Sequence, residues 1–234
     1  MSGAAGNNTT TTESSGGRAG GSAIGALHGA YVHGRRVRVL ASWLTRLLPR
    51  DASVLDVGCG DGLIASLVQR ERPDLRIVGI DVLVRERTHV PVQPFDGAQM
   101  PLPDGGVDVV MFVDVLHHTL DPMVLLREAD RVARTHVVIK DHTADGFLAR
   151  PTLRFMDRVG NARHGVALPY NYWTRAQWDA AFAELRWESE AMERALGLYP
   201  VPANWLFGRG LHFIGSFRVS EHPDKRAKAQ AMVA

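Results

Sequence analysis

One glycine-rich turn constrains the fold more than any other part of the chain. It reads VLDVGCGDG at residues 54–62, between an apolar run at 53–57 that predicts a strand and a stretch at 63–72 that predicts a helix. Glycine has no Cβ, so the backbone here can turn tightly and approach a ligand. The spacing is G-x-G-x-G, whereas the dinucleotide-binding pattern would place its third glycine where Leu63 stands. Asp56, at the end of the strand, would repel a pyrophosphate but suits a cationic or amino-bearing ligand.

Strands and helices alternate along the chain around this turn. Such alternation indicates parallel strand–helix–strand units and a doubly wound α/β sheet. Asp121 followed by Pro122 predicts a helix start, and Thr174 with Gln177 predicts a capping box at another. Further strands are predicted at 75–80, 89–95, 107–113 and 136–140, helices at 37–48, 121–134, 146–159 (interrupted by Pro151) and 174–185, and a final antiparallel pair at 186–196 and 211–219.

Composition excludes several classes of protein. The 234 residues carry 27 lysines and arginines against 25 acidic residues, and a net charge of +2 is no signature of nucleic-acid binding. No apolar run is long enough to span a membrane, and residues 1–21 lack the apolar centre of a signal peptide. The single cysteine, Cys59, excludes an internal disulfide and favours a reducing cytoplasm.

The domain organisation follows from composition along the chain. Residues 1–22 are mostly Gly, Ser, Thr and Asn, which predicts a disordered tail, and 220–234 predict a frayed one. We expect a single domain at 33–219, with substrate-determining insertions at about 141–173 and 196–210. The arginines of the first helix (Arg35, Arg36, Arg38 and Arg46) are interpreted as a solvated face in preference to an anion-binding patch.

Five segments follow one another in the order known from one enzyme family. Asp-x-Gly-x-Gly-x-Gly at 56–62, Val-Gly-Ile-Asp-Val at 78–82 and Asp-Gly at 96–97 are followed by segments at 106–118 and 125–129. Together they resemble class I S-adenosylmethionine (SAM)-dependent methyltransferases over residues 54–140. The resemblance implies a Rossmann-like, mostly parallel seven-stranded sheet with an antiparallel terminal strand. It also implies SAM as the cosubstrate.

The resemblance assigns residues to that cosubstrate. Asp81 lies 19 residues after Gly62, near the distance expected of an acid that binds ribose hydroxyls, although it can also be an ordinary strand-end carboxylate. Asp96 is expected at the adenine amino group, with a turn aspartate as the alternative. Cys59 is expected only to be small enough for the turn. The predicted set is Asp56, Gly58, Cys59, Gly60, Gly62, Asp81, Val82, Asp96, Gly97, Val113, Asp114 and His118.

Catalytic candidates come from the ends of the fourth and fifth strands, where open α/β sheets place their ligands. We predict His142 as a general base, because it comes just after the strand at 136–140 and its pKa is near neutral, with His118 second and Asp141 beside them. His142 can instead be a surface or structural histidine, and His118 can instead only contact SAM. His117 and His118 are neighbours and are expected to point apart. A metal site from these histidines and Asp141 is conceivable, but the resemblance does not require one and we expect none.

The loop at 160–173 is predicted to define the acceptor. Its candidate substrate-binding residues are Arg163, His164, Tyr170, Asn171, Tyr172 and Trp173. The first two suit an anionic group and the aromatic ones suit a pocket wall, but the aromatic ones suit a core at the sheet edge equally well.

The predicted function is methyl transfer to an O, N or C atom of a small molecule, with no nucleic-acid or membrane partner. No basic tract appears, and Asp-Val-Leu-His at 114–117 stands where amino-methylating enzymes of nucleic acids or proteins carry an asparagine-proline tetrapeptide. Two alternatives stay open. One is a cyclase or lyase that acts on SAM itself, and the other is a non-catalytic SAM-binding subunit. The sequence leaves the oligomeric state open.

Overall fold

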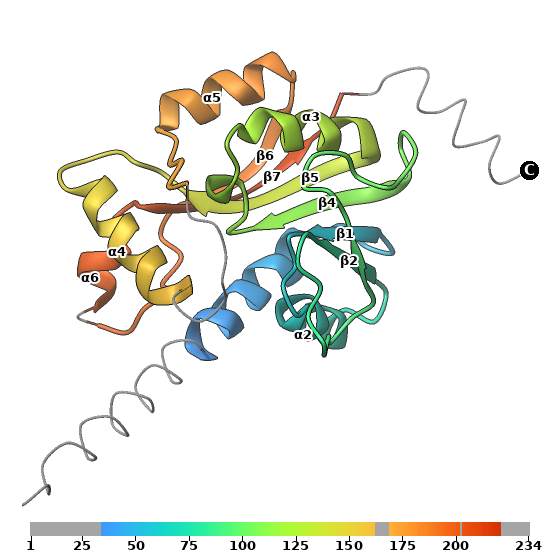
Figure 1. Ribbon diagram of the computed structural model, residues 1–234, viewed down its shortest axis with the longest axis horizontal. Coiled ribbons are helices and arrows are strands. Elements are labelled where there is room, and N and C mark those ends of the chain that lie inside the picture. The colour runs from blue at the N-terminus through green and yellow to red at the C-terminus, as the bar shows by residue number, and fades with distance from the viewer. Residues whose placement is uncertain (1–33, 162–168, 202, 221–234) are drawn as a thin grey trace, which may run out of the picture.

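A seven-stranded sheet forms the centre of the protein (Figure 1). The computed structural model describes residues 34–161, 169–201 and 203–220. The strand order is β3-β2-β1-β4-β5-β7-β6, and β7 runs antiparallel to both of its neighbours while the other pairs are parallel. This confirms the predicted α/β fold class. The strands are β1 (Ser53–Val57), β2 (Arg76–Asp81), β3 (Val92–Pro94), β4 (Val107–Val113), β5 (Ala133–His142), β6 (Glu188–Glu193) and β7 (His212–Arg218).

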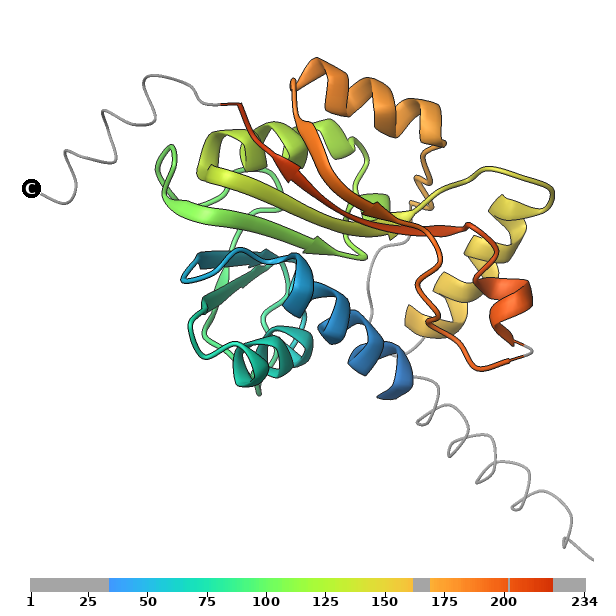
Figure 2. The same cartoon turned by 180° about the vertical axis from the view of Figure 1, so that it is seen from behind.

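Helices cover both faces of the sheet (Figures 1 and 2). The helix at 34–47 packs with α2 on one face, and α3 packs with α5 on the other. A third group, α4 and α6, lies beyond the ends of β4 and β5 (Figure 1). The helices that follow the one at 34–47 are α2 (Leu63–Glu71), the 3-10 helix η1 (Leu116–His118), α3 (Pro122–Val132), α4 (Ala149–Asn161), α5 (Arg175–Glu184) and α6 (Ala203–Phe207).

The central strands are buried on both faces, which explains their nearly continuous apolar sequence. Leu55 and Val57 of β1 pack into the core under α3 and α5, whereas Val54 faces the core under α2. All three are at most 1% exposed. The two cores hold the sheet rigidly, so the strand ends become fixed positions for polar side chains.

Helix starts follow their sequence signals. The Asp121 side chain accepts a hydrogen bond from the Met123 N–H at the start of α3, and Thr174 and Gln177 form the reciprocal capping box of α5. Pro151 does not interrupt α4, contrary to expectation. It stands in the first turn of that helix, where a missing N–H costs no hydrogen bond.

Strand β5 differs most from its prediction. It begins directly after α3 and ends at His142, so Asp141 and His142 lie inside the strand and pair with Phe213 and His212 of β7. Strand β3 is shorter than the predicted run at 89–95, and α6 was not predicted.

Several predictions lie outside the described residues: the tail at 1–22, most of the tail at 220–234, and the roles of Arg163 and His164. Within the described ranges, no helix is both long and apolar enough to cross a membrane.

Candidate functional site

The glycine turn between β1 and α2 is held in a left-handed backbone, with φ of 69° at Gly58 and 61° at Gly60. A Cβ on Gly58 would lie 2.7 Å from a methyl carbon of Val115, so packing requires glycine there. A Cβ on Gly60 would meet nothing within 4 Å. The Gly60 backbone therefore borders open space at the carboxyl edge of the sheet, where a ligand can approach it closely.

Asp81, the last residue of β2, holds this turn in place. Its Oδ2 accepts the Gly60 N–H at 2.8 Å and its Oδ1 accepts the Leu83 N–H at 2.8 Å. Each carboxylate oxygen has two lone pairs, so each keeps an acceptor site for a ligand hydroxyl. Cys59 lies against Gly79, where an added Cβ would come within 2.3 Å of its sulfur, and this crowding agrees with a role as a small residue.

Asp56 is buried beneath the turn and is only 3% exposed. Burial, with a smaller contribution from the charge of Asp81, raises the pKa of Asp56 to about 8. Its carboxyl group is therefore mostly protonated at neutral pH. A cation placed beside it would favour ionisation.

Val82, Asp96 and Gly97 meet next to the turn. Val82 is 65% exposed, and a Cβ on Gly97 would lie 3.1 Å from its side chain. Oδ1 of Asp96 accepts the N–H groups of Gln99 and Ala98, which lower the Asp96 pKa. A hollow of about 450 Å³ here is lined by Phe95, Asp96, Gln99, Met100, Pro101 and Leu102. The exposed side chain of Val82, the carboxylate of Asp96 and the hollow thus lie together.

Asp114 follows β4 with a positive φ of 59° and forms ion pairs with Arg36 and Lys140. Burial opposes its charge, but these two cations outweigh burial and hold the pKa of Asp114 well below its usual range. Lys140 is fully buried in β5. The solvated-face interpretation is therefore wrong for Arg36, which reaches from the 34–47 helix to the end of the sheet.

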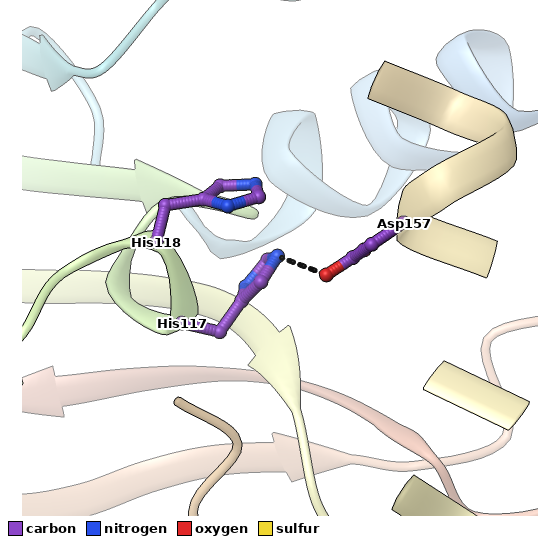
Figure 3. A group of neighbouring side chains, drawn as sticks. All are labelled: His117, His118 and Asp157. Carbon is purple, nitrogen blue, oxygen red and sulfur yellow. Dashed lines mark ion pairs between the residues drawn. The ribbon is translucent and has the colours of Figure 1, made fainter. Parts of the chain in front are cut away.

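His117 lies between the carboxylates of Asp141 and Asp157, of which Figure 3 draws Asp157. Its Nδ1 is 2.6 Å from Oδ1 of Asp141, and its Nε2 is 3.4 Å from Oδ2 of Asp157 on α4. Burial lowers the His117 pKa, but Asp141 and Asp157 outweigh burial and raise it to about 10. The Tyr172 hydroxyl donates a hydrogen bond to the same Oδ2 of Asp157. This chain of groups joins η1, β5, α4 and the segment before α5.

Three further histidines differ in exposure. His142 and His212 are 3% and 1% exposed, and burial followed by the nearby Lys140 lowers both pKa values, that of His142 to about 4. His118 is half-buried, and its pKa is lowered by burial and by His117. Its Nδ1 is buried and has no hydrogen-bond partner in the described part of the chain. Of these groups, His118 alone keeps appreciable exposure.

The expectation that His117 and His118 point apart is wrong. Their ring centroids lie 4.0 Å apart, because the two residues belong to the 3-10 turn η1 and not to an extended strand. Both rings face the region of Asp157, as Figure 3 shows.

The described part of the predicted substrate loop packs mainly against the protein itself. Asn171 donates to the carbonyls of Thr119 and Leu120, Tyr172 is 2% exposed, and the Trp173 ring contacts Trp178 with centroids 4.9 Å apart. Tyr170 is half-buried and has a positive φ of 55°. Their contact with a substrate stays a prediction.

Four residues of this region were not predicted as site residues. They are Arg36, Lys140, Asp157 and His212. Lys140 had a usable signal, because a single lysine in the apolar run Val-Val-Ile-Lys is costly to bury without a partner. Asp157 had none, since an aspartate among the arginines of a helix looks like an ordinary surface residue.

An open glycine turn, a strand-end acid and a hollow at the carboxyl edge of a doubly wound sheet define a nucleoside-binding α/β enzyme fold. The family model described as "Methyltransferase domain" matches residues 31–190. The chain therefore belongs to the methyltransferase domain family, and SAM is the cosubstrate that this membership assigns to it.

Relatives that are named as methyltransferases match this chain over part of their length. A Mycobacterium tuberculosis protein named "Probable S-adenosylmethionine-dependent methyltransferase" is 38% identical over 96 residues, which are 38% of this chain and 35% of that protein. An uncharacterised methyltransferase of Mycobacterium bovis is 40% identical over 80 residues, 31% of this chain and 41% of that one. The matched segments thus span only 35% and 41% of the length of these relatives.

Solved structures share the fold at low identity. A Haloferax volcanii chain described as a methyltransferase, solved in complex with a methyltransferase activator, gives a TM-score of 0.59 at 15% identity, covering 82% of this chain and 95% of that one. Geranyl diphosphate C-methyltransferase from Streptomyces coelicolor, solved with Mg²⁺, geranyl diphosphate and S-adenosylhomocysteine, gives 0.59 at 14% identity, covering 77% and 79%.

Proposed function

We propose that the protein transfers the methyl group of SAM to an O, N or C atom of a small-molecule acceptor. The observation that carries this proposal is the open Gly60 backbone, held at 2.8 Å by the carboxylate of Asp81. Asp81 would bind the ribose hydroxyls, the hollow beside Asp96 and Val82 would take the adenine, and Asp56 would face the amino group of the methionine part.

The reaction is an in-line displacement, in which the C–S bond to the sulfonium breaks as the bond to the acceptor forms. Alignment and exclusion of water supply most of the catalysis. Asp141 and His142 are buried and bonded to their neighbours, so we assign them to positioning. His118 is half-exposed at the end of β4, and we assign it to the acceptor side.

Support for a small acceptor comes from what covers the strand ends. Helix α4 reaches His117 through Asp157, and Asn171 is tied to the chain after η1, so the acceptor side is covered by the protein's own segments. Such a covered site suits a small molecule better than a long polymer. Nucleic acid is further disfavoured by the net charge of +2.

Binding calorimetry with S-adenosylhomocysteine tests the cosubstrate site. We expect binding to the wild-type chain, a loss of about 10–100-fold in Asp81→Asn because hydrogen bonds to a carboxylate are lost, and no change in the surface control Glu190→Gln. Equal binding by Asp81→Asn would rule the assigned site out.

Product analysis separates the alternatives. The protein is incubated with SAM and pools of candidate small molecules, and its products are identified by mass spectrometry. S-adenosylhomocysteine with a methylated acceptor supports the proposal. Methylthioadenosine would indicate an enzyme that cleaves or cyclises SAM, and binding without turnover in every pool would favour a regulatory subunit.

A further inference from the structure

Two imidazoles and a carboxylate converge after the end of β4, and Nδ1 of one imidazole, that of His118, has no hydrogen-bond partner among the described residues. One ligand atom from each of His117, His118 and Asp157 lies within 4.8 Å of the others. They come from η1 and α4, which are about forty residues apart in the chain (Figure 3). We propose that His117, His118 and Asp157 bind a divalent transition-metal ion such as Zn²⁺.

The first argument is the distance from Nε2 of His117 to Oδ2 of Asp157, which is 3.4 Å. A charge-assisted N–H···O hydrogen bond is typically about 2.7–2.9 Å long. Two donors bound to one Zn²⁺ at about 2.0–2.1 Å with a tetrahedral angle lie about 3.4 Å apart. The observed spacing therefore suits an ion between the two atoms better than a proton.

The second argument is that partners outside the ligand set already orient two of the ligands. Asp141 accepts the Nδ1–H of His117 at 2.6 Å, which directs the lone pair of Nε2 away from β5 and toward Asp157. Tyr172 donates its hydroxyl to the Asp157 carboxylate. Metal-binding histidines and carboxylates usually have such partners, which fix the tautomer and the orientation. An ion would replace the Nε2 proton of His117 and release it to solvent.

The third argument comes from His118, whose buried Nδ1 has no hydrogen-bond partner in the described ranges. A buried polar atom without a partner costs free energy, which a ligand bound by this ring would recover. Asp114 forms ion pairs with Arg36 and Lys140, and two other carboxylates contact His117. These two carboxylates are Asp141 and Asp157, and the His117 ring lies between them.

Two nitrogens and one carboxylate oxygen form a donor set suited to Zn²⁺ and its neighbours in the first transition row. Three protein ligands leave a fourth position for water or for an acceptor oxygen, whose proton would become more acidic there. This use of the ion rests on the proposed methyl transfer. Binding of the ion does not. No metal was expected from the sequence because the family resemblance does not require one, and Asp157 was not among the ligands considered.

The test uses tag-free, chelator-treated protein titrated with Zn²⁺ in a calorimeter and with Co²⁺ in a spectrophotometer. We expect one ion per chain, with the strong visible absorption of Co²⁺ bound at a protein site of low coordination number. Asp157→Asn and His118→Gln should each lower the association constant at least about 100-fold, and Tyr172→Phe about 10–100-fold. The control His89→Gln, at an exposed histidine, should leave it unchanged.

Absence of stoichiometric binding would overturn the proposal, and so would equal binding by wild type and His118→Gln. His118→Gln decides the matter if Asp157→Asn fails to fold, because the His118 Nδ1 makes no hydrogen bond that the substitution would break. S-adenosylhomocysteine binding measured on the same samples reports separately on the methyltransferase site, so failure of one proposal is distinguishable from failure of the other.

Discussion

Nδ1 of His117 lies 2.6 Å from Oδ1 of Asp141, and this hydrogen bond joins the turn η1, which follows β4, to β5. The same carboxylate accepts the backbone N–H groups of Leu116 and His142. Asp141 is fully buried, so its charge is stabilised by these donors and by the His142 ring, whose Nδ1 lies 3.3 Å from Oδ1 of Asp141. The geometry of the acceptor side therefore depends on one carboxylate that contacts no solvent.

Replacing that carboxylate should destabilise the fold. Asp141→Asn removes the charge and turns one acceptor into a donor that faces other donors. We expect the free energy of unfolding to fall by about 3 kcal/mol, measured by urea denaturation. The control Glu184→Gln, in an exposed ion pair with Arg127, should change it by less than about 0.5 kcal/mol. Similar small losses in both variants would contradict this account.

The ion pair between Asp114 and Lys140 should show strong coupling. Lys140→Met leaves Asp114 with Arg36 as its ion-pair partner, and Asp114→Asn leaves a charged lysine buried in β5. We expect each variant to lose about 3 kcal/mol of stability and the double variant to lose at least about 1 kcal/mol less than the sum. A double-mutant cycle of urea denaturation measures this, and additive losses would refute a direct interaction.

The glycines of the turn should separate stability from binding. Gly58→Ala forces a Cβ to within 2.7 Å of Val115 and should cost about 2–3 kcal/mol in unfolding free energy. Gly60→Ala meets no neighbour, so it should cost only the left-handed backbone strain of about 1 kcal/mol. Its added methyl group would face the cosubstrate, however. Calorimetry should therefore show a loss of binding free energy for S-adenosylhomocysteine that is larger than the loss of unfolding free energy. Unchanged affinity in Gly60→Ala would mean that the ligand does not approach this backbone.

The affinity for S-adenosylhomocysteine should depend on pH through Asp56. The pKa of Asp56 is raised to about 8, so the free protein carries it protonated at pH 6, whereas a bound ammonium group favours the carboxylate. Binding then releases a proton, and affinity should rise by up to about tenfold per pH unit between pH 6 and about 7.5. Calorimetry in buffers of different ionisation enthalpy measures that proton.

Asp56→Asn provides the matched comparison, since it keeps the size and removes the titration. Its affinity should be nearly flat over the same pH range. The stability of the wild type should also fall as pH rises from about 4 toward 8, because the folded state holds this proton more tightly than the unfolded chain. A wild-type affinity independent of pH would show that Asp56 does not face the amino group.

Local sequence determined most of the architecture. The turn at 54–62, the caps at Asp121 and Thr174 and the apolar runs each act within a few residues, so the sheet class and the helix starts could be read directly. Where a predicted boundary was wrong, pairing with a neighbouring element had determined where the strand ends. Strand β5 extends beyond its apolar run because β7 pairs with it as far as His142.

The acceptor side was decided by tertiary structure. Arg36 lies on the 34–47 helix, Asp114 follows β4 and Lys140 lies in β5, and no local pattern in these segments shows that the three residues pair. They meet because parallel strands end at one edge of the sheet and the 34–47 helix packs beside that edge. The same packing brings Asp157 of α4 to His117, about forty residues away in sequence. Burial then makes every unpaired charge costly in free energy. That cost depends on contacts between distant segments, which no local pattern encodes, and it determines which groups pair and which histidine keeps a nitrogen without a partner.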